Sequence, residues 1–568
     1  MAHRPDGLPQ CRRRGIEGRP GALRAATALG SACRIVVWAA LAAACLVPSV
    51  SAQGERPLVT IGDGQLAGTV DDAGIRVFKG IPFAAPPVGD LRWKEPQPVA
   101  PWTGTRDASG FGDRCQQMPF PAYRPIGNSG MSENCLFLNV WSAPGADRRP
   151  VIVWIHGGGF GYGYSNQAEY DGDRFVEKGL VYVDLNYRVG AFGFLALPEL
   201  TQASPHKSSG NYGILDQVAA LQWVRRNIVA FGGDPDNVTI FGESAGSISV
   251  NVLTASPLAR GLFTRAIGDS GAGLGTTIDT LPVRPLAWEE ERGTKFEKAL
   301  GARSLAELRA IPAASIADAG ENGPGNLFNA SRFAPAIDGY LMTETPAETY
   351  ARGAQNNAAL LTGWSSHEEI TFMLGSGHGG CRPEWNDAGT PGTFVQQATR
   401  SFGADTAAFL ELYPHATDAE AKTSAANVVA DLVITWPTWK WAELQSASGK
   451  TRTYLYLFGK TPPAQYPFHA AAHGSEIPYA FDNLQTHDWS WDPVDHQLAR
   501  TMSSYYANFA MTGDPNGPGL PAWPLYRSAD PQHMVFDADG VAAAPFSLAK
   551  FQLLDANRSA GPWCPEVK

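Results

Sequence analysis

The sequence predicts an α/β fold in which a mostly parallel sheet is flanked by helices. Three observations lead to this prediction. Short apolar runs recur along the chain, longer segments with apolar residues at helical spacing separate them, and no internal repeat or low-complexity linker interrupts the pattern. Strands that are buried on both faces and joined by helical crossovers form parallel sheets.

Five apolar runs are the candidate buried strands: Leu136–Trp141, Val151–His156, Val181–Asn186, Val238–Phe241 and Ala358–Thr362. Between the third and the fourth, Leu215–Ala230 has apolar residues at the spacing of a helix. The segments Ser249–Asn357 and Thr371–Lys450 are too long for simple crossovers. We expect both to be helical insertions that cap one end of the sheet.

The first 52 residues are expected to lie outside this domain. Seven arginines and two acidic residues precede the apolar run Ile35–Val47, and small residues follow it up to Ala52. This order is typical of a secretory signal peptide, with cleavage after Ala52 and a secreted or periplasmic product. A membrane anchor is one alternative, but the run is short for a membrane span. A lipoprotein modified at Cys45 is another. Residues 53–568 are then predicted to form a single domain.

The composition excludes several classes of protein. Hydrophobic residues make up 44% of the 568-residue chain and aromatic residues 10%, which is enough to build a large core and excludes a disordered chain. The 45 Lys and Arg residues face 55 Asp and Glu residues, and the resulting charge of −10 argues against a nucleic-acid binder. No segment after the leader is long and apolar enough to span a membrane stably.

Four cysteines follow the leader, namely Cys115, Cys135, Cys381 and Cys564. An even number in an exported protein predicts disulfides, and four cysteines allow three pairings. Cys115–Cys135 is the local choice, and closing that loop stabilises a fold by about 3 kcal/mol in the chain-entropy model. Cys381–Cys564 would then tie the C-terminal tail to the body. Because no close cysteine pair or histidine cluster is present, neither a metal site nor a cofactor is expected.

The sharpest catalytic signal is the segment Gly242-Glu243-Ser244-Ala245-Gly246. It follows a predicted strand and precedes the apolar stretch Ile248–Leu253, and G-x-S-x-G in this context is typical of a nucleophile elbow. Side chains at Gly242 and Gly246 would clash with neighbouring backbone in so tight a turn. Ser244 is then expected in a strained conformation at the start of a helix. An ordinary serine in a tight turn is the alternative.

A second signal is the run Gly157-Gly158-Gly159, which comes directly after the strand ending at His156. Consecutive glycines let backbone N–H groups approach a ligand, and fixed donors of this kind stabilise the oxyanion of acyl transfer. A phosphate loop is the alternative, but no Lys-Ser/Thr pair follows. We expect His156 itself to have a structural role.

Together these segments resemble the type-B carboxylesterase family, the cholinesterase-like branch of the α/β-hydrolases. The matching stretches run through most of residues 53–568 and include Phe78–Trp93, Ser132–Trp141, Val151–Phe160, Asn186–Leu195, Asn211–Ser247, His473–Phe481 and Thr512–Pro518. The resemblance implies an α/β-hydrolase fold with helical cap insertions. It also implies a secreted, bacterial-type carboxylesterase.

The resemblance also implies the remaining catalytic residues. An activated serine needs a base and an orienting carboxylate, which this fold supplies in the chain order serine, acid, histidine. The family's histidine, in HG-x-E-I/L-P-Y, matches His473. Its acid, in G-x-x-x-x-E-G, matches Glu368, but Glu369 stands where the family has glycine and is the alternative acid. The implied oxyanion hole consists of the N–H groups of Gly158, Gly159 and Ala245.

The activity implied by the resemblance is the hydrolysis of a small-molecule carboxylic ester through an acyl-enzyme. An amidase or carbamate hydrolase would use the same triad. A non-catalytic, cholinesterase-like binding protein is a further alternative, although the triad residues are all present. Cholinesterases carry a tryptophan in the loop closed by the first disulfide, and Gln116–Asn134 has none, so choline esters are not expected. Candidate pocket residues, with core packing as the alternative, are Phe333, Trp364, Phe372 and Met373.

Overall fold

The computed structural model describes residues 56–119, 129–274, 283–322, 333–370, 385 and 388–558. These residues belong to one compact unit, Arg56–Lys568. The predicted leader 1–52 lies outside the described residues, as do Cys381, Cys564, Phe372 and Met373. Within the described ranges, no helix has the length and apolar character needed to span a bilayer.

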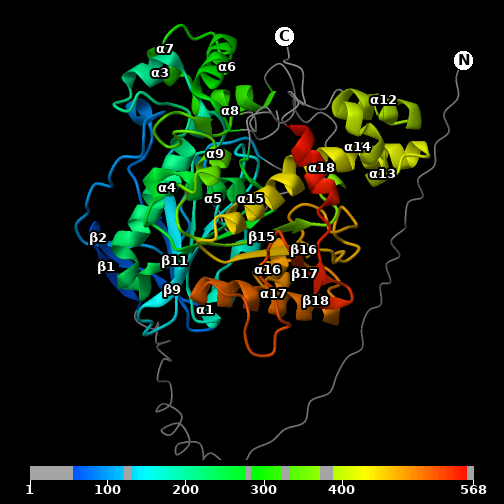
Figure 1. Cartoon of the computed structure of the whole chain (residues 1–568). Coiled ribbons are helices and arrows are strands. Elements are labelled where there is room, and N and C mark those ends of the chain that lie inside the picture. Colours follow the sequence, from blue (N-terminus) through cyan, green and yellow to red (C-terminus); the bar gives the residue numbers. More distant parts are fainter. Residues whose placement is uncertain are drawn as a thin grey trace, which may run out of the picture. The chain divides into compact units, whose positions relative to one another are not determined.

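An eleven-stranded sheet forms the centre of the fold (Figure 1). In spatial order its strands are β18 (Gly540–Pro545), β17 (Gln532–Asp537), β16 (Thr453–Phe458), β15 (Ala359–Ser365), β12 (Arg265–Asp269), β11 (Gly233–Glu243), β9 (Arg149–Ile155), β10 (Val181–Leu185), β8 (Phe137–Ser142), β4 (Arg76–Pro82) and β3 (Thr69–Val70). Three small sheets contain β1 (Leu58–Ile61), β2 (Gly64–Ala67) and β5 (Thr105–Asp107), β6 (Arg114–Cys115) and β7 (Met131–Ser132), and β13 (Arg284–Pro285) and β14 (Ala336–Ile337).

The helices are α1 (Asp173–Glu177), α2 (Gly190–Phe194), α3 (Pro198–Ala203), α4 (Tyr212–Asn227), α5 (Ala245–Ala255), α6 (Leu286–Ala299), α7 (Leu305–Ala310), α8 (Ala313–Asn322), α9 (Pro346–Ala351), α12 (Pro391–Phe402), α13 (Thr406–Leu412), α14 (Asp418–Ala430), α15 (Trp436–Ala447), α16 (Ile477–Ala480), α17 (Pro493–Thr512) and α18 (Ala549–Arg558). Helix α4 is the helix predicted from the periodicity of 215–230. The predicted fold class, a mostly parallel sheet flanked by helices, is confirmed.

Helices cover both faces of the sheet. On one face α5 contacts β11 and β12, and α15 contacts β15 and β16, whereas α1 and α17 contact β9, β10 and β11 on the other (Figure 1). Side chains of β9 alternate accordingly: Val151, Val153 and Ile155 pack into one core cluster, and Ile152 and Trp154 into another. Burial on both faces explains why the predicted parallel strands are almost continuously apolar.

One of the predicted strands lies outside the parallel part of the sheet. The run expected at 136–141 is β8, which lies antiparallel to β10 rather than within the parallel part of the sheet. The chain passes from β8 to β9 through residues 143–148, and no helix intervenes. Because a parallel connection needs a crossover of a dozen or more residues, this short link requires β8 and β9 to run in opposite directions.

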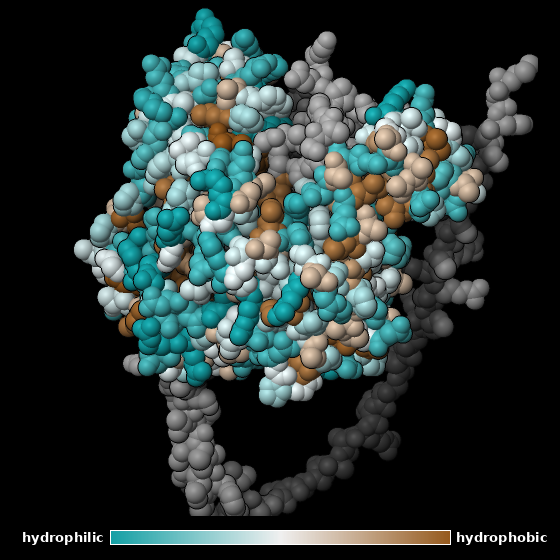
Figure 2. All heavy atoms as spheres, viewed as in Figure 1, coloured by the Kyte–Doolittle hydropathy of each residue, from teal (hydrophilic) through white to brown (hydrophobic). Residues whose placement is uncertain are grey.

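The two long segments are also not wholly insertions. Within Ser249–Asn357, α5 continues to Ala255 and β12 then enters the sheet between β11 and β15. Within Thr371–Lys450, helix α15 packs on β15 and β16 and is therefore a crossover. Of the other helices in these segments, α6–α8 and α12–α14 lie in the upper part of the view in Figure 1. Hydrophobic residues gather near α6 and α8 and over α12–α15 on the face shown in Figure 2.

The strand register brings several strand ends to one edge of the sheet. Gly242 of β11 pairs with Ile155 of β9, and Glu243 pairs with Asp269 of β12. Asp269 in turn pairs with Gly363 of β15. Segments that follow these four parallel strands therefore start side by side, which is where open α/β sheets place their binding sites.

Candidate active site

The turn after β11 has the geometry expected of a nucleophile elbow. Ser244 has a backbone φ of +56°, and α5 begins at the next residue. A Cβ atom at Gly242 would lie 2.5 Å from the carbonyl carbon of Gly246, and one at Gly246 would lie 2.0 Å from the carbonyl oxygen of Ile155. These contacts confirm the steric reason for both glycines. The strained φ of Ser244 is confirmed as well.

Three side chains from distant parts of the sequence form a hydrogen-bonded series at this edge. His473 Nε2 lies 2.8 Å from Ser244 Oγ, and His473 Nδ1 lies 2.6 Å from Glu368 Oε2. If Nδ1 carries the hydrogen and donates it to the carboxylate, Nε2 is left as an acceptor facing the serine hydroxyl. His473 Nε2 can therefore accept the proton of the Ser244 hydroxyl.

The carboxylate of Glu368 is held from a second side. Its Oε1 accepts hydrogen bonds from the Ser365 backbone N–H at 3.0 Å and from the Ser270 hydroxyl at 2.8 Å. The residue is only 1% exposed. These bonds leave Oε2 for His473 and fix its direction.

The structure separates the two adjacent glutamates. Glu368 points to His473, whereas the carboxylate of Glu369 lies 2.9 Å from Nδ1 of His367. Among the two alternatives that the sequence left open, Glu368 is thus the one in contact with the histidine.

Additional buried carboxyl groups surround His473. Glu243 Oε1 lies 3.3 Å from His473 Nε2, and Glu476 accepts a hydrogen bond from the Ser365 hydroxyl at 2.9 Å. Burial raises the pKa of Glu243 to about 8 and that of Glu476 to about 7. Burial opposes charging of His473, but the negative charges of Glu368 and Glu243 outweigh it and raise its pKa above the usual value. The site therefore stabilises the imidazolium that forms when His473 accepts a proton.

The glycine run lies against the elbow. A Cβ atom at Gly157 would be 3.1 Å from Cβ of Ser244. Gly158 and Gly159 have φ values of +105° and +61°, which favour glycine. Among the described residues, no acceptor receives the backbone N–H of Gly158, Gly159 or Ala245. Ala245 N–H belongs to the first turn of α5, where no intrahelical partner exists. All three donors remain available for a ligand.

His156 is built into the protein interior. Its ring stacks on Tyr187 with centroids 4.3 Å apart, and Nδ1 lies 2.9 Å from the carbonyl oxygen of Gly157. Burial lowers its pKa to about 4, so it remains neutral at pH 7. This agrees with the structural role expected for it.

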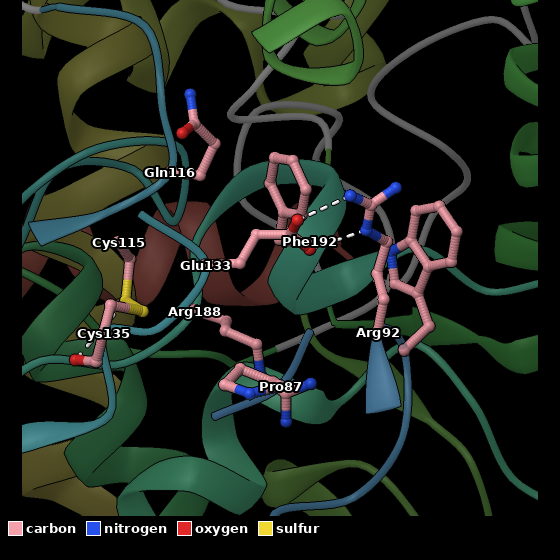
Figure 3. A pocket seen from close by; sticks show the side chains of 9 residues that line it. Pro87, Arg92, Cys115, Gln116, Glu133, Cys135, Arg188 and Phe192 are labelled. Atoms are coloured by element: carbon pink, nitrogen blue, oxygen red, sulfur yellow. Dashed lines mark hydrogen bonds and ion pairs between the residues drawn. A yellow bond between two sulfur atoms is a disulfide. The ribbon is translucent and has the colours of Figure 1, made fainter. Parts of the chain in front are cut away.

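The predicted disulfide Cys115–Cys135 is present. Figure 3 shows it next to a pocket that Phe192 and the ion pair of Arg92 with Glu133 also line. That pair is bidentate, with N–O distances of 2.6 and 2.5 Å. The bridge and the ion pair together anchor the chain between Cys115 and Cys135.

Two candidate pocket residues have other roles. Phe333 packs against Phe296, and Trp364 packs against Phe546 and Phe551, so both belong to the core, which was the alternative for them. Conversely, the sequence reasoning did not assign Ser270, Ser365 and Glu476 to the site. Glu476 lies within the HG-x-E motif that located His473. For Ser270 no local signal exists, because it is recognisable only from the pairing of β12 with β15.

Proteins of similar sequence match most of this chain. A family model described as the carboxylesterase family matches residues 55–552. Fumonisin B1 esterase of Sphingopyxis macrogoltabida is 33% identical over 547 residues, covering 91% of this chain and 94% of that protein. Para-nitrobenzyl esterase of Bacillus subtilis is 33% identical, with coverages of 85% and 95%. Acetylcholinesterase of Bungarus fasciatus is also 33% identical, with coverages of 84% and 81%.

Solved structures are similar along nearly the whole described chain. A PNB esterase structure superposes with a TM-score of 0.75 at 31% identity and covers 88% of this chain and 99% of its own. A carboxylesterase of Geobacillus stearothermophilus gives a TM-score of 0.74 at 33% identity, with coverages of 88% and 99%.

The close contact between Gly246 and Ile155 can be tested by adding a methyl group at Gly246. We expect Gly246→Ala to lower the free energy of unfolding by about 3 kcal/mol, because the new methyl group would overlap the carbonyl of Ile155. Gly392→Ala is the matched control, since a Cβ atom there meets nothing within 4 Å. Urea unfolding of both variants measures the difference. Equal stability of the two variants would contradict the steric account.

Proposed function

Because the chain belongs to the carboxylesterase family and has the α/β-hydrolase fold, it is a carboxylic-ester hydrolase, and we propose that Ser244, Glu368 and His473 carry out the hydrolysis. The observation that carries this proposal is the pair of hydrogen bonds, 2.8 and 2.6 Å long, that joins the three side chains through the imidazole. The arrangement is that of a nucleophile, a general base and the carboxylate that orients it.

The first step forms an acyl-enzyme. His473 Nε2 takes the proton of Ser244 as Oγ attacks the ester carbonyl carbon, and the carbonyl oxygen becomes an oxyanion. The N–H groups of Gly158, Gly159 and Ala245 donate hydrogen bonds to this oxyanion. Collapse of the tetrahedral intermediate breaks the bond to the alcohol oxygen, which receives the proton from His473.

The second step releases the acid. His473 takes a proton from water, and the resulting hydroxide attacks the acyl carbon. Collapse of the second intermediate returns the proton to Ser244 Oγ and frees the carboxylic acid. The carboxylate of Glu368 holds Nδ1–H throughout and stabilises the imidazolium.

The substrate class follows from the loop beside the disulfide. Residues 116–134 contain no tryptophan, whose indole is the aromatic group that binds a quaternary ammonium best, so this contact is missing from that loop. Two of the relatives are named for esters other than choline esters, fumonisin B1 esterase and para-nitrobenzyl esterase. We therefore propose a small-molecule ester without a quaternary ammonium group as the substrate.

Replacing the nucleophile tests the proposal directly. Ser244→Ala is expected to lower kcat for 4-nitrophenyl acetate by roughly 10⁴- to 10⁶-fold, because no oxygen remains to attack the carbonyl. Thermal unfolding should be unchanged, and Ser504→Ala on α17 serves as a serine control outside the site. Normal turnover by a folded Ser244→Ala protein would overturn the assignment.

A second pair of variants distinguishes the two glutamates. Glu368→Gln should lower kcat by about 10⁴-fold, because the amide no longer holds the imidazole as required. It should also shift the acid limb of kcat/KM to lower pH, since removing the negative charge lowers the pKa of His473. Glu369→Gln should lower kcat by no more than about 10-fold. If the two variants exchanged these effects in a pH–rate measurement, Glu369 would be the acid.

We also propose that residues 1–52 are a signal peptide and that the enzyme acts in the periplasm or outside the cell. The basic segment, the short apolar run and the small residues before Gln53 support this. Intact-mass analysis of the exported protein should give a chain that begins at Gln53. A chain that retains residues 1–52 would contradict export by cleavage, and a diacylglycerol adduct on Cys45 would identify the lipoprotein alternative.

A further inference from the structure

The loop that carries Glu368 has a second buried carboxyl group, that of Glu369. The Glu369 side chain is only 8% exposed. A carboxylate removed from water destabilises the fold unless a cation or several donors compensate it. The buried carboxylate of Glu369 therefore requires a compensating partner.

That partner is His367, two residues earlier. Its Nδ1 lies 2.9 Å from Glu369 Oε1, and its ring is half exposed. The hydrogen bond with Glu369 raises the pKa of His367 above 6.5, although partial burial acts against this. The two side chains thus form a pair in which Glu369 is buried and His367 is in contact with solvent. In the sequence they flank Glu368.

The backbone of His367 joins the acid loop to the histidine loop. Its N–H donates to the carbonyl of Ala471 at 2.9 Å, two residues before His473. The neighbouring Ser366 N–H donates to Phe458, the last residue of β16, at 2.8 Å. A shift of His367 would therefore alter the distance between Glu368 Oε2 and His473 Nδ1, which depends on the relative position of these two loops.

We propose that His367 is a positioning residue for the catalytic acid and that its ion pair with Glu369 holds the acid loop in register with His473. This rests on the proposed role of Glu368 in ester hydrolysis. His367 does not touch the reacting atoms and acts through the loop.

The other charged groups around this loop have partners of their own. Glu368 faces His473, and Glu476 binds the hydroxyl of Ser365. Lys460, just after β16, forms ion pairs with Asp492 and Asp495. Within the described residues, Glu369 is the one charged group that contacts the His367 ring.

The pair makes the contribution of His367 dependent on pH. The pKa of His367 is raised in the folded protein. The ion pair therefore stabilises the acid loop fully below pH 6.5, and this stabilisation is lost as the pH rises through the folded-state pKa of His367. A role of His367 in packing alone would not depend on pH in this way.

The test compares kcat of the wild-type protein and of His367→Gln across pH on 4-nitrophenyl acetate. We expect the ratio of wild-type kcat to His367→Gln kcat to be about 3 to 10 near pH 6 and to fall toward one near pH 9. KM should be unchanged because His367 does not touch the substrate. A ratio of one at all pH values, or a constant ratio above one, would overturn the proposal.

Two further variants keep the test specific. His206→Gln is the matched control, because His206 is also partly exposed and lies 3.6 Å from a carboxylate, that of Glu95. Its ratio should remain one, and a pH-dependent ratio like that of His367→Gln would contradict a specific effect. Glu369→Gln removes the buried charge without removing His367. The double variant should lose no more activity than either single variant, whereas additive losses would contradict a shared interaction.

Failure of the proposed function has a separate signature. If Ser244→Ala retained normal turnover, the triad would be wrong, but the pair could still be tested through stability. The difference in thermal midpoint between the wild-type protein and His367→Gln should be larger near pH 6 than near pH 9. A difference that does not change with pH would overturn the ion pair as the means by which His367 acts.

Discussion

The arrangement of the site depends on one close approach between backbones, that of Gly246 to the carbonyl of Ile155. Because no side chain stands between them, the start of α5 can lie directly over the end of β9. The elbow after β11 and the glycine run after β9 then share one corner of the sheet. Ser244 and Ala245 follow β11, whereas Gly158 and Gly159 follow β9, so this packing is what makes the proposed nucleophile and its proposed N–H donors neighbours.

A second constraint is electrostatic. Glu243, Glu368 and Glu476 are all buried around a single imidazole, and three uncompensated charges in the interior would be strongly destabilising. The structure reduces this through hydroxyl groups of Ser270 and Ser365, through raised pKa values of Glu243 and Glu476, and through His473 itself. The same negative charges that destabilise the interior raise the pKa of His473 and make it a stronger base.

A feature of this structure could be predicted from the sequence where a local pattern of residues determines it, and not where contacts between distant segments determine it. Strands such as β9 and β11 are apolar on both faces, and the glycines around Ser244 report a local steric demand, so both were predictable. Strand β16 has the same apolar character and could have been predicted. Strand β12, with the sequence RAIGD, has too few apolar residues to be recognised, and its position decides where Ser270 lies. The antiparallel orientation of β8 could have been predicted from the short link at 143–148, whereas the pairing of Glu369 with His367 depends on how the loop folds.

The hydrogen-bonded series also links activity to the order in which the chain folds. Ser244 and His473 are 229 positions apart, and Glu368 and His473 are 105 apart. Contacts of such high sequence separation close late and slowly. With the proposed triad, a chain that has emerged only as far as Glu369 holds the nucleophile and the acid but not the base, so we expect it to have no esterase activity. Hydrolysis is therefore a reporter of completed folding: it begins only when the C-terminal third of the sheet has formed around residues that were synthesised long before.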